Sequence, residues 1–160
     1  MSAVAKIISG GQTGADRAGL EAARRAGIAT GGTAPKGFLT ELGPQPDLLS
    51  AYGLVEHASA DYPARTEANV IAADATIVIG AAPDRGSVLT AELCARHGKT
   101  CRVVAATTDA EAATTAAWLV AEHEALGRRL VVNVAGNRES HEPGLEARAT
   151  EFLAAVFRRL

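Results

Sequence analysis

The sequence predicts an α/β fold in which a mainly parallel sheet is covered by helices on both faces. Apolar runs of strand length alternate along the chain with longer segments of helical period, which is the order that such a fold requires. The strand-like runs are short and nearly continuous in apolar residues, and strands of this kind are buried on both faces, as in doubly wound α/β domains. The 160 residues contain no internal repeat or linker, so we expect one domain over residues 1–160.

Five strands and five helices are expected to alternate along the chain. The helical segments are rich in Ala and Glu, Asp109 is a good N-cap, and Pro63 suits the first turn of a helix. The expected strands are 4–9, 54–57, 76–80, 101–105 and 130–134. The expected helices are 16–26, 64–73, 87–96, 109–126 and 143–159.

One connection, residues 29–51, breaks this alternation. It is rich in Gly, Pro and Thr and separates the first helix from the next expected strand by more than twenty residues. Loops of this length in compact domains are usually functional or mobile. The glycine pair at 31–32 and the run Pro35-Lys36-Gly37 favour a loop of defined shape. A disordered excursion is the alternative.

Composition and charge exclude several classes of protein. Hydrophobic residues make up 48% and charged residues 21% of the chain, as in ordinary globular proteins. The net charge is −2 and the basic residues are scattered, which argues against nucleic-acid binding. The apolar runs are too short for a membrane span and no signal peptide is visible, so we expect a cytoplasmic protein. The two cysteines, Cys94 and Cys101, fit no metal or redox motif and are expected to be buried thiols.

The strongest local motif follows the first expected strand and opens the first expected helix, at residues 9–19. Glycines at the carboxyl end of a strand let backbone N–H groups approach an anion at the positive end of a helix, which predicts a phosphate-sized anion site. The motif matches neither the dinucleotide pattern G-x-G-x-x-G nor a P-loop, which disfavours NAD and ATP. A purely structural turn is the alternative.

Polar residues also follow the second expected strand. Arg65 and Asn69 are four residues apart, so they project from one helix face, with Thr66 beside Arg65. The forked guanidinium of Arg65 could clamp a phosphate or a carboxylate. The alternative for Arg65 is an ion pair with Asp61 or Glu67.

Two further strand ends carry similar loops. Gly86 and Ser87 lie at a strand-to-helix junction, where they could bind an anion or where Ser87 could act as a plain N-cap. The last strand is followed by the polar run 133–140. Four of the five expected strands therefore deliver glycines and polar residues to one edge of the sheet, and we expect the functional site there.

Residues suited to catalysis are scarce by comparison. His57, His97, His123 and His141 have no metal-binding spacing, and no serine lies in a G-x-S-x-G motif. We therefore assign no catalytic residue and no metal ligand.

A long series of motifs resembles the molybdenum cofactor carrier family, and it runs in order along nearly the whole chain. The matching segments are 8–20 (with Gly-Gly-Gln-Thr-Gly-Ala-Asp-Arg), 35–37, 52–56, 61–62, 65–66, 69–70, 73–76, 89–90 and 133–136. The resemblance implies a Rossmann-like fold, binding of the molybdenum cofactor without turnover, and a homo-oligomer such as a tetramer. It also allows molybdoenzymes or cofactor-synthesis proteins as partners, and it indicates a relationship to LOG-like phosphoribohydrolases of nucleoside monophosphates.

Two departures from the family pattern stand out. The chain has Arg85-Gly86-Ser87 where members typically have Gly-Gly-Thr, and Gly136-Asn137-Arg138 where they have Gly-Pro-Arg. Ser87 keeps a hydroxyl, whereas Arg85 adds a charge that could tune ligand choice. Thr90 occupies the position of the hydrolases' catalytic glutamate, and a hydroxyl cannot replace that carboxylate as an acid or base, which argues against hydrolysis.

Together these observations predict a carrier of the anionic molybdenum cofactor. A nucleotide-binding sensor or a nucleoside-monophosphate phosphoribohydrolase, with Asp16 or Glu92 as its acid, is the alternative. A third hypothesis is a structural or partner-binding domain whose glycines only form turns. The expected cofactor-binding residues are Gly10, Gly11, Gln12, Thr13, Gly14, Asp16, Lys36, Arg65, Thr66, Asn69, Gly86, Ser87 and Thr90.

Overall fold

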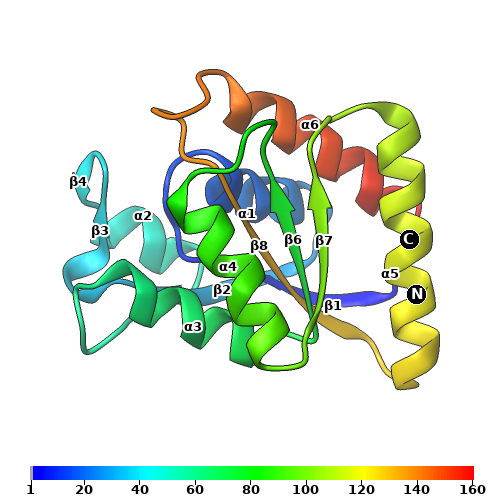
Figure 1. Cartoon of the computed structure of the whole chain (residues 1–160), viewed down its shortest axis with the longest axis horizontal. Coiled ribbons are helices and arrows are strands. Elements are labelled where there is room, and N and C mark those ends of the chain that lie inside the picture. The colour runs from blue at the N-terminus through cyan, green and yellow to red at the C-terminus, as the bar shows by residue number, and fades with distance from the viewer. Residues whose placement is uncertain (1) are drawn as a thin grey trace.

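Six parallel strands form the central sheet of the computed structural model, which describes residues 2–160 (Figure 1). Their order across the sheet is β5-β2-β1-β8-β6-β7. The strands are β1 (Val4–Ile8), β2 (Ala29–Ala34), β5 (Leu54–Glu56), β6 (Ala75–Ile79), β7 (Thr100–Val104) and β8 (Leu130–Gly136). The predicted α/β class with a parallel sheet is confirmed.

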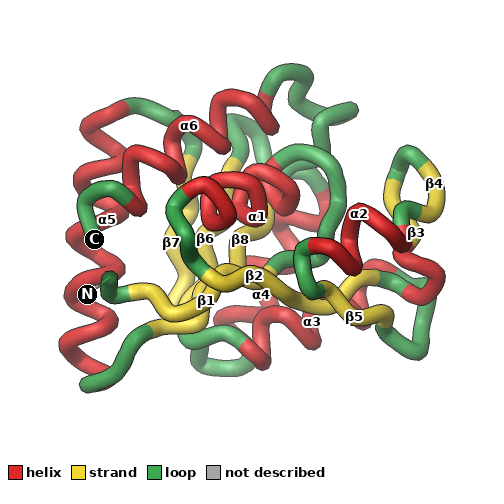
Figure 2. Tube along the Cα trace, turned by 180° about the vertical axis from the view of Figure 1, so that it is seen from behind, coloured by secondary structure: helices red, strands yellow, loops and turns green. Residues whose placement is uncertain are grey.

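Helices cover both faces of this sheet, as the views from the two sides show (Figures 1 and 2). One layer contains α1 (Ala15–Arg25), α5 (Asp109–Leu126) and α6 (Leu145–Phe157), and the other contains α3 (Tyr62–Ala72) and α4 (Arg85–Arg96). A short helix α2 (Pro46–Ala51), a 3-10 turn η1 (Lys36–Phe38) and a small antiparallel pair, β3 (Leu39–Thr40) and β4 (Gly43–Pro44), lie beyond the β5 edge. No helix within residues 2–160 combines the length and apolar character that crossing a membrane requires.

The continuous apolar strands form the core. All five residues of β6 are buried, and Ile77 and Ile79 pack in one cluster with Val132 and Val134 of β8. Helix α1 approaches β8 closely because Gly19 has no side chain: a Cβ there would be 2.6 Å from the Cβ of Val134. The burial expected from the apolar pattern is therefore observed.

The last strand, β8, lies in the middle of the sheet between β1 and β6. If β8 and α6 preceded β1 in the sequence, the chain would run outward from β8 in both directions, as in a doubly wound sheet. The two chain ends are close in both views, and the backbone oxygen of Ser2 accepts a hydrogen bond from Arg129, directly before β8. The topology is therefore a circular permutation of a doubly wound fold, and the point where strand order reverses lies between β8 and β6.

The interpretation of residues 29–51 as one long loop was wrong. This segment contains the inner strand β2, helix α2 and the β3–β4 pair. Its glycines have low strand propensity, so the sequence pattern did not indicate β2. Gly32 is required there because its φ is 125° and a Cβ would be 2.1 Å from the backbone oxygen of Ser9. Close packing of two strands thus explains the composition that suggested a loop.

Candidate functional site

A cavity of about 340 Å³ opens at the carboxyl ends of β1, β6 and β8, next to the reversal point of strand order. We call it the rim cavity. The loops that follow β1, β5, β6 and β8 all contribute to it, so the predicted convergence of four loops is observed. Its wall consists of Gln12, Asp16, Tyr62, Pro63, Arg65, Thr66, Asp84, Arg85, Gly86, Leu89, Thr90, Ala135, Gly136 and Arg138.

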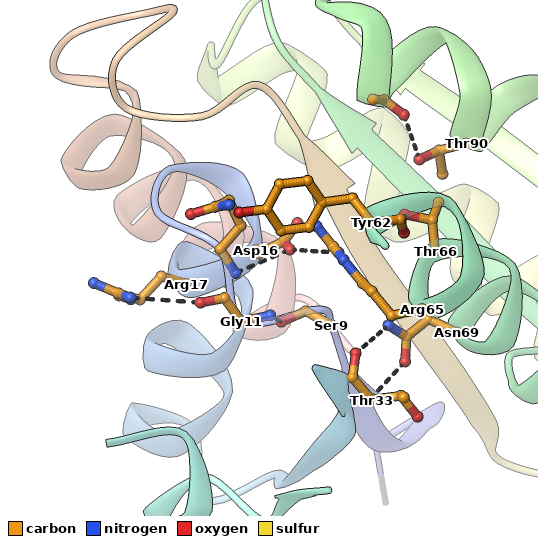
Figure 3. A network of polar contacts seen from close by, with 12 residues as sticks. Ser9, Gly11, Asp16, Arg17, Thr33, Tyr62, Arg65, Thr66, Asn69 and Thr90 are labelled. Atoms are coloured by element: carbon orange, nitrogen blue, oxygen red, sulfur yellow. Dashed lines mark hydrogen bonds and ion pairs between the residues drawn. The ribbon is translucent and has the colours of Figure 1, made fainter. Parts of the chain in front are cut away.

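A buried ion pair lies in the wall of the rim cavity (Figure 3). Nη1 of Arg65 donates to Oδ2 of Asp16 over 3.1 Å, and the side chains are only 12% and 5% exposed. Oδ2 also accepts the backbone N–H of Gln12 at 3.2 Å. Burial raises the pKa of Asp16 above its ordinary value, and the charge of Arg65 and the N–H of Gln12 oppose that rise. The pairing partner of Arg65 is therefore Asp16, and neither Asp61 nor Glu67, the two alternatives considered from the sequence.

The guanidinium of Arg65 is held between an aromatic ring and a glycine. Its Cζ lies 5.6 Å from the centre of the Tyr62 ring, and the guanidinium also lies against the backbone of Gly10. Tyr62 precedes Arg65 by three residues on α3, so both side chains share a helix face (Figure 3). Nε of Arg65 is buried without a hydrogen-bond partner. An unpaired buried donor is costly. Because Nε has almost no accessible surface, a ligand acceptor in the cavity could reach it only after the Arg65 side chain shifts.

Two more arginines surround the cavity opening. Arg85 and Arg138 are exposed and form no ion pair within residues 2–160. Arg85 begins α4, and the first turn of a helix carries a partial positive charge. Against the three arginines, the cavity wall contains only two carboxylates, Asp16 and Asp84. The electrostatics therefore favour an anionic ligand.

The glycine-rich loop before α1 uses its backbone N–H groups internally. Those of Gly11, Gln12 and Thr13 are donated to side chains within residues 9–16. The N–H of Gly14 is donated to the carboxylate of Glu146, at 3.1 Å. Phosphate binding by this loop stays a prediction, because a phosphate there would have to displace these acceptors.

The β3–β4 hairpin is attached to this glycine-rich loop, which the sequence did not reveal. Glu41, at the tip of the β3–β4 hairpin, accepts hydrogen bonds from the hydroxyls of Thr13 and Ser140 and from the N–H of Ser140. The N–H of Glu41 is donated to Gln12 Oε1 at 2.9 Å. Partial burial would raise the pKa of Glu41, but the hydrogen bonds from Ser140 and Thr13 outweigh it and lower that pKa. The hairpin is thereby fastened to the loops after β1 and β8.

Six predicted residues line the rim cavity: Gln12, Asp16, Arg65, Thr66, Gly86 and Thr90. Others have roles within the fold. The amide of Asn69 pairs with both backbone groups of Thr33, at 2.9 Å each, and so attaches α3 to β2. Ser87 donates its hydroxyl to Asp84 and Asn137, and Lys36 lies in η1, away from the cavity wall.

Sequence reasoning missed several wall residues, above all Tyr62, Asp84 and Arg138. Helical spacing from Arg65 could have revealed Tyr62, whereas the place of Arg138 depends on how the loop after β8 folds. Glu92, one candidate acid for hydrolysis, is exposed and does not line the cavity. The other, Asp16, does.

Residues 7–157 match the circularly permutated YpsA SLOG family, in agreement with the position of β8. A crystal structure at 1.45 Å resolution of a protein from Syntrophus aciditrophicus, described as a "putative molybdenum carrier protein", is 34% identical, with a TM-score of 0.86. The match covers 97% of this chain and 96% of that one. No curated protein matches significantly. The Rossmann-like fold and the predicted likeness to molybdenum carriers are confirmed, and the chain belongs to the circularly permutated YpsA SLOG family.

Proposed function

We propose that the protein binds and carries the molybdenum cofactor in the rim cavity. The cofactor is a phosphorylated molybdopterin that holds its molybdenum through its own dithiolene, so the carrier need not supply a ligand to the metal. The similarity to a protein described as a molybdenum carrier supports this cargo.

The observation that carries the proposal is the presence of three arginines, Arg65, Arg85 and Arg138, in the wall of one cavity. A ligand that brings an oxyanion and further acceptors would satisfy all three side chains. Each hydrogen bond to a charged group contributes roughly 1.5–3 kcal/mol. Three or four such bonds, after the cost of association, correspond to about micromolar affinity.

In this arrangement the phosphate lies at the start of α4, near Arg85, Gly86 and Arg138. The pterin lies towards Tyr62 and Arg65, where its polar edge meets the guanidinium. The cavity volume of about 340 Å³ falls within the range of about 300–1,000 Å³ that is common for small-molecule sites. Binding of the phosphate by Gly10, Gly11, Thr13 and Gly14 is the other arrangement, and it requires the side chains of Ser9, Gln12 and Glu146 to release the N–H groups that they now accept.

We also propose that the carrier acts as a cytoplasmic homo-oligomer that exchanges its cargo with molybdoenzymes or cofactor-synthesis proteins. This rests on the resemblance described for the sequence. Light scattering of the purified protein measures the oligomeric state directly, and a monomer with or without cargo would contradict it.

Anaerobic titration calorimetry at near-physiological salt tests the binding proposal, with molybdenum cofactor, AMP and molybdate as parallel titrants. We expect saturable cofactor binding at about micromolar affinity, and much weaker binding of the other two. Stronger binding of AMP would replace the carrier function with a nucleotide-binding one. Turnover on a panel of nucleoside monophosphates that is lost in Asp16→Asn would instead establish the hydrolase alternative.

A further inference from the structure

Two thiols lie against each other outside the rim cavity, where α4 packs on the edge strand β7. Cys94 of α4 is 1% exposed and belongs to a small apolar cluster with Val70 and Leu93, and Cys101 of β7 packs on that cluster. The two side chains are within hydrogen-bonding distance. They are also the only cysteines of the chain. Cys101 is half-buried rather than buried as expected from the sequence.

The chain between the two cysteines forms a fixed turn. Helix α4 ends at Arg96, and Gly98 has a φ of 63°. The N–H of Lys99 is donated to the backbone oxygen of Cys94 at 2.9 Å. This turn keeps the two thiols together whenever the domain is folded, and it makes their proximity a property of the native state.

The environment of the pair favours chemistry at sulfur. The hydrogen bond from Cys101, opposed by burial, lowers the pKa of Cys94 to about 7 and raises that of Cys101. Near neutral pH the pair therefore holds one thiolate beside one thiol, which is the combination needed to form a disulfide. Cys101 is partly exposed and borders a surface hollow of about 470 Å³, so it is the residue of the pair that a small oxidant can approach.

We propose that Cys94 and Cys101 are a redox-active pair that a hydroperoxide converts reversibly into an intramolecular disulfide. Because Cys94 is only 1% exposed, Cys101 is the sulfur that the peroxide meets. Cys101 passes its proton to the Cys94 thiolate and attacks one peroxide oxygen, an S–O bond forms, the O–O bond breaks, and the departing hydroxide takes up a proton to become water. The second sulfur then attacks the sulfenic sulfur, the S–S bond forms, and the S–O bond breaks with release of a second water. Two electrons pass from the two sulfurs to the peroxide, and a dithiol reverses the change.

The test treats the intact protein with a small excess of hydrogen peroxide at neutral pH and then follows free thiols and mass. We expect both thiols to disappear together, the monomer to lose two hydrogens in mass, and dithiothreitol to restore both thiols. Loss of one thiol well before the other would overturn the proposal, as would disulfide-linked dimers.

Single variants provide the matched controls. In Cys94→Ser the remaining, partly exposed thiol has no intramolecular partner, so we expect added oxygen atoms in the mass and no disulfide. In Cys101→Ser the buried Cys94 should stay reduced. The wild-type measurement stands by itself if the buried Cys94 variant does not fold. Addition of oxygen to the wild-type protein, with no loss of two hydrogens, would show two independent thiols and refute the pair.

Discussion

The guanidinium of Arg65 lies directly on the backbone of Gly10: a Cβ built at Gly10 would be 1.6 Å from Nη1 of the arginine. The same Nη1 is donated to Asp16, which is itself held by the N–H of Gln12. The absence of a side chain at Gly10 is therefore what allows an arginine from α3 to reach the carboxylate at the start of α1. The glycine motif and the arginine, 55 positions apart in the sequence, form one structural unit.

The substitution Gly10→Ala should disable ligand binding and, because it separates Arg65 from the buried Asp16, also lower the free energy of unfolding. The added methyl group collides with the end of a flexible side chain, so Arg65 can move aside, but its pairing with Asp16 is then lost. We expect cofactor affinity to fall about tenfold or more, as the loss of one charged hydrogen bond implies. Gly31→Ala is the matched control, because its Cβ would collide only with the flexible end of Lys6 and would meet the backbone oxygen of Gly53 at an ordinary 3.5 Å. Equal cofactor affinity in both variants would contradict the role given to Arg65.

Replacement of Arg65 itself should show whether cofactor binding needs only its positive charge or also the planar shape of its guanidinium. Arg65→Lys keeps the positive charge near Asp16 but loses the planar fork, so we expect roughly 10–100-fold weaker cofactor binding in calorimetry. Arg65→Ala leaves Asp16 buried without its partner, which should reduce the free energy of unfolding by about 3–5 kcal/mol in urea titrations. Undiminished binding by the lysine variant would show that only charge is recognised.

The exposed arginines at the opening of the rim cavity should attract the cofactor through their positive charge. Arg138→Gln is expected to weaken cofactor binding about tenfold and to make the affinity less sensitive to salt, because one screened attraction is removed. Arg96→Gln is the control, since Arg96 is an exposed arginine at the far end of α4. Cofactor affinity is measured for both variants at two salt concentrations. Equal affinities and equal salt dependence in Arg138→Gln and Arg96→Gln would contradict a role for Arg138 in binding.

The sequence correctly predicts the strands whose run of apolar residues follows from burial on both faces. The run Ala75–Ile79 is apolar throughout because both of its faces are covered. In the strand Ala29–Ala34, Gly32 is required because it lies against the backbone of Ser9, and with Gly31 beside it the strand's own residues carry little strand preference. Local pattern therefore fails where the backbone approaches another strand too closely for side chains.

A similar limit applies to the candidate site. Arg65 could be assigned to the rim because its helix follows a strand, but its pairing with Asp16 joins residues 49 positions apart. Asn69 and Ser87 are the residue types that bind ligands and equally those that hold loops and caps. Only their contacts in the structure show that they stabilise the fold: Asn69 bonds to Thr33, and Ser87 bonds to Asp84 and Asn137.

The β3–β4 hairpin provides a prediction about pH. Hydrogen bonds from Ser140 and Thr13 outweigh partial burial and hold the pKa of Glu41 below its ordinary value of 4.5. A carboxylate with a lowered pKa in the folded state contributes stability above its unfolded pKa, and this contribution is lost as pH falls through the folded pKa. The attachment of the hairpin should therefore weaken in acid.

Glu41→Gln should remove this dependence, because the amide carries no charge to titrate. Between about pH 6 and about pH 3, we expect the free energy of unfolding of the variant to change less than that of the wild type. At neutral pH, hydrogen exchange at the N–H of Glu41 and of Ser140 should be faster in the variant, since the amide nitrogen cannot accept the bond that one carboxylate oxygen accepts. Glu124→Gln, on the exposed side of α5, should keep the wild-type profile in both measurements. An unchanged pH profile in Glu41→Gln would mean that the hairpin is attached by its backbone bond to Gln12 alone.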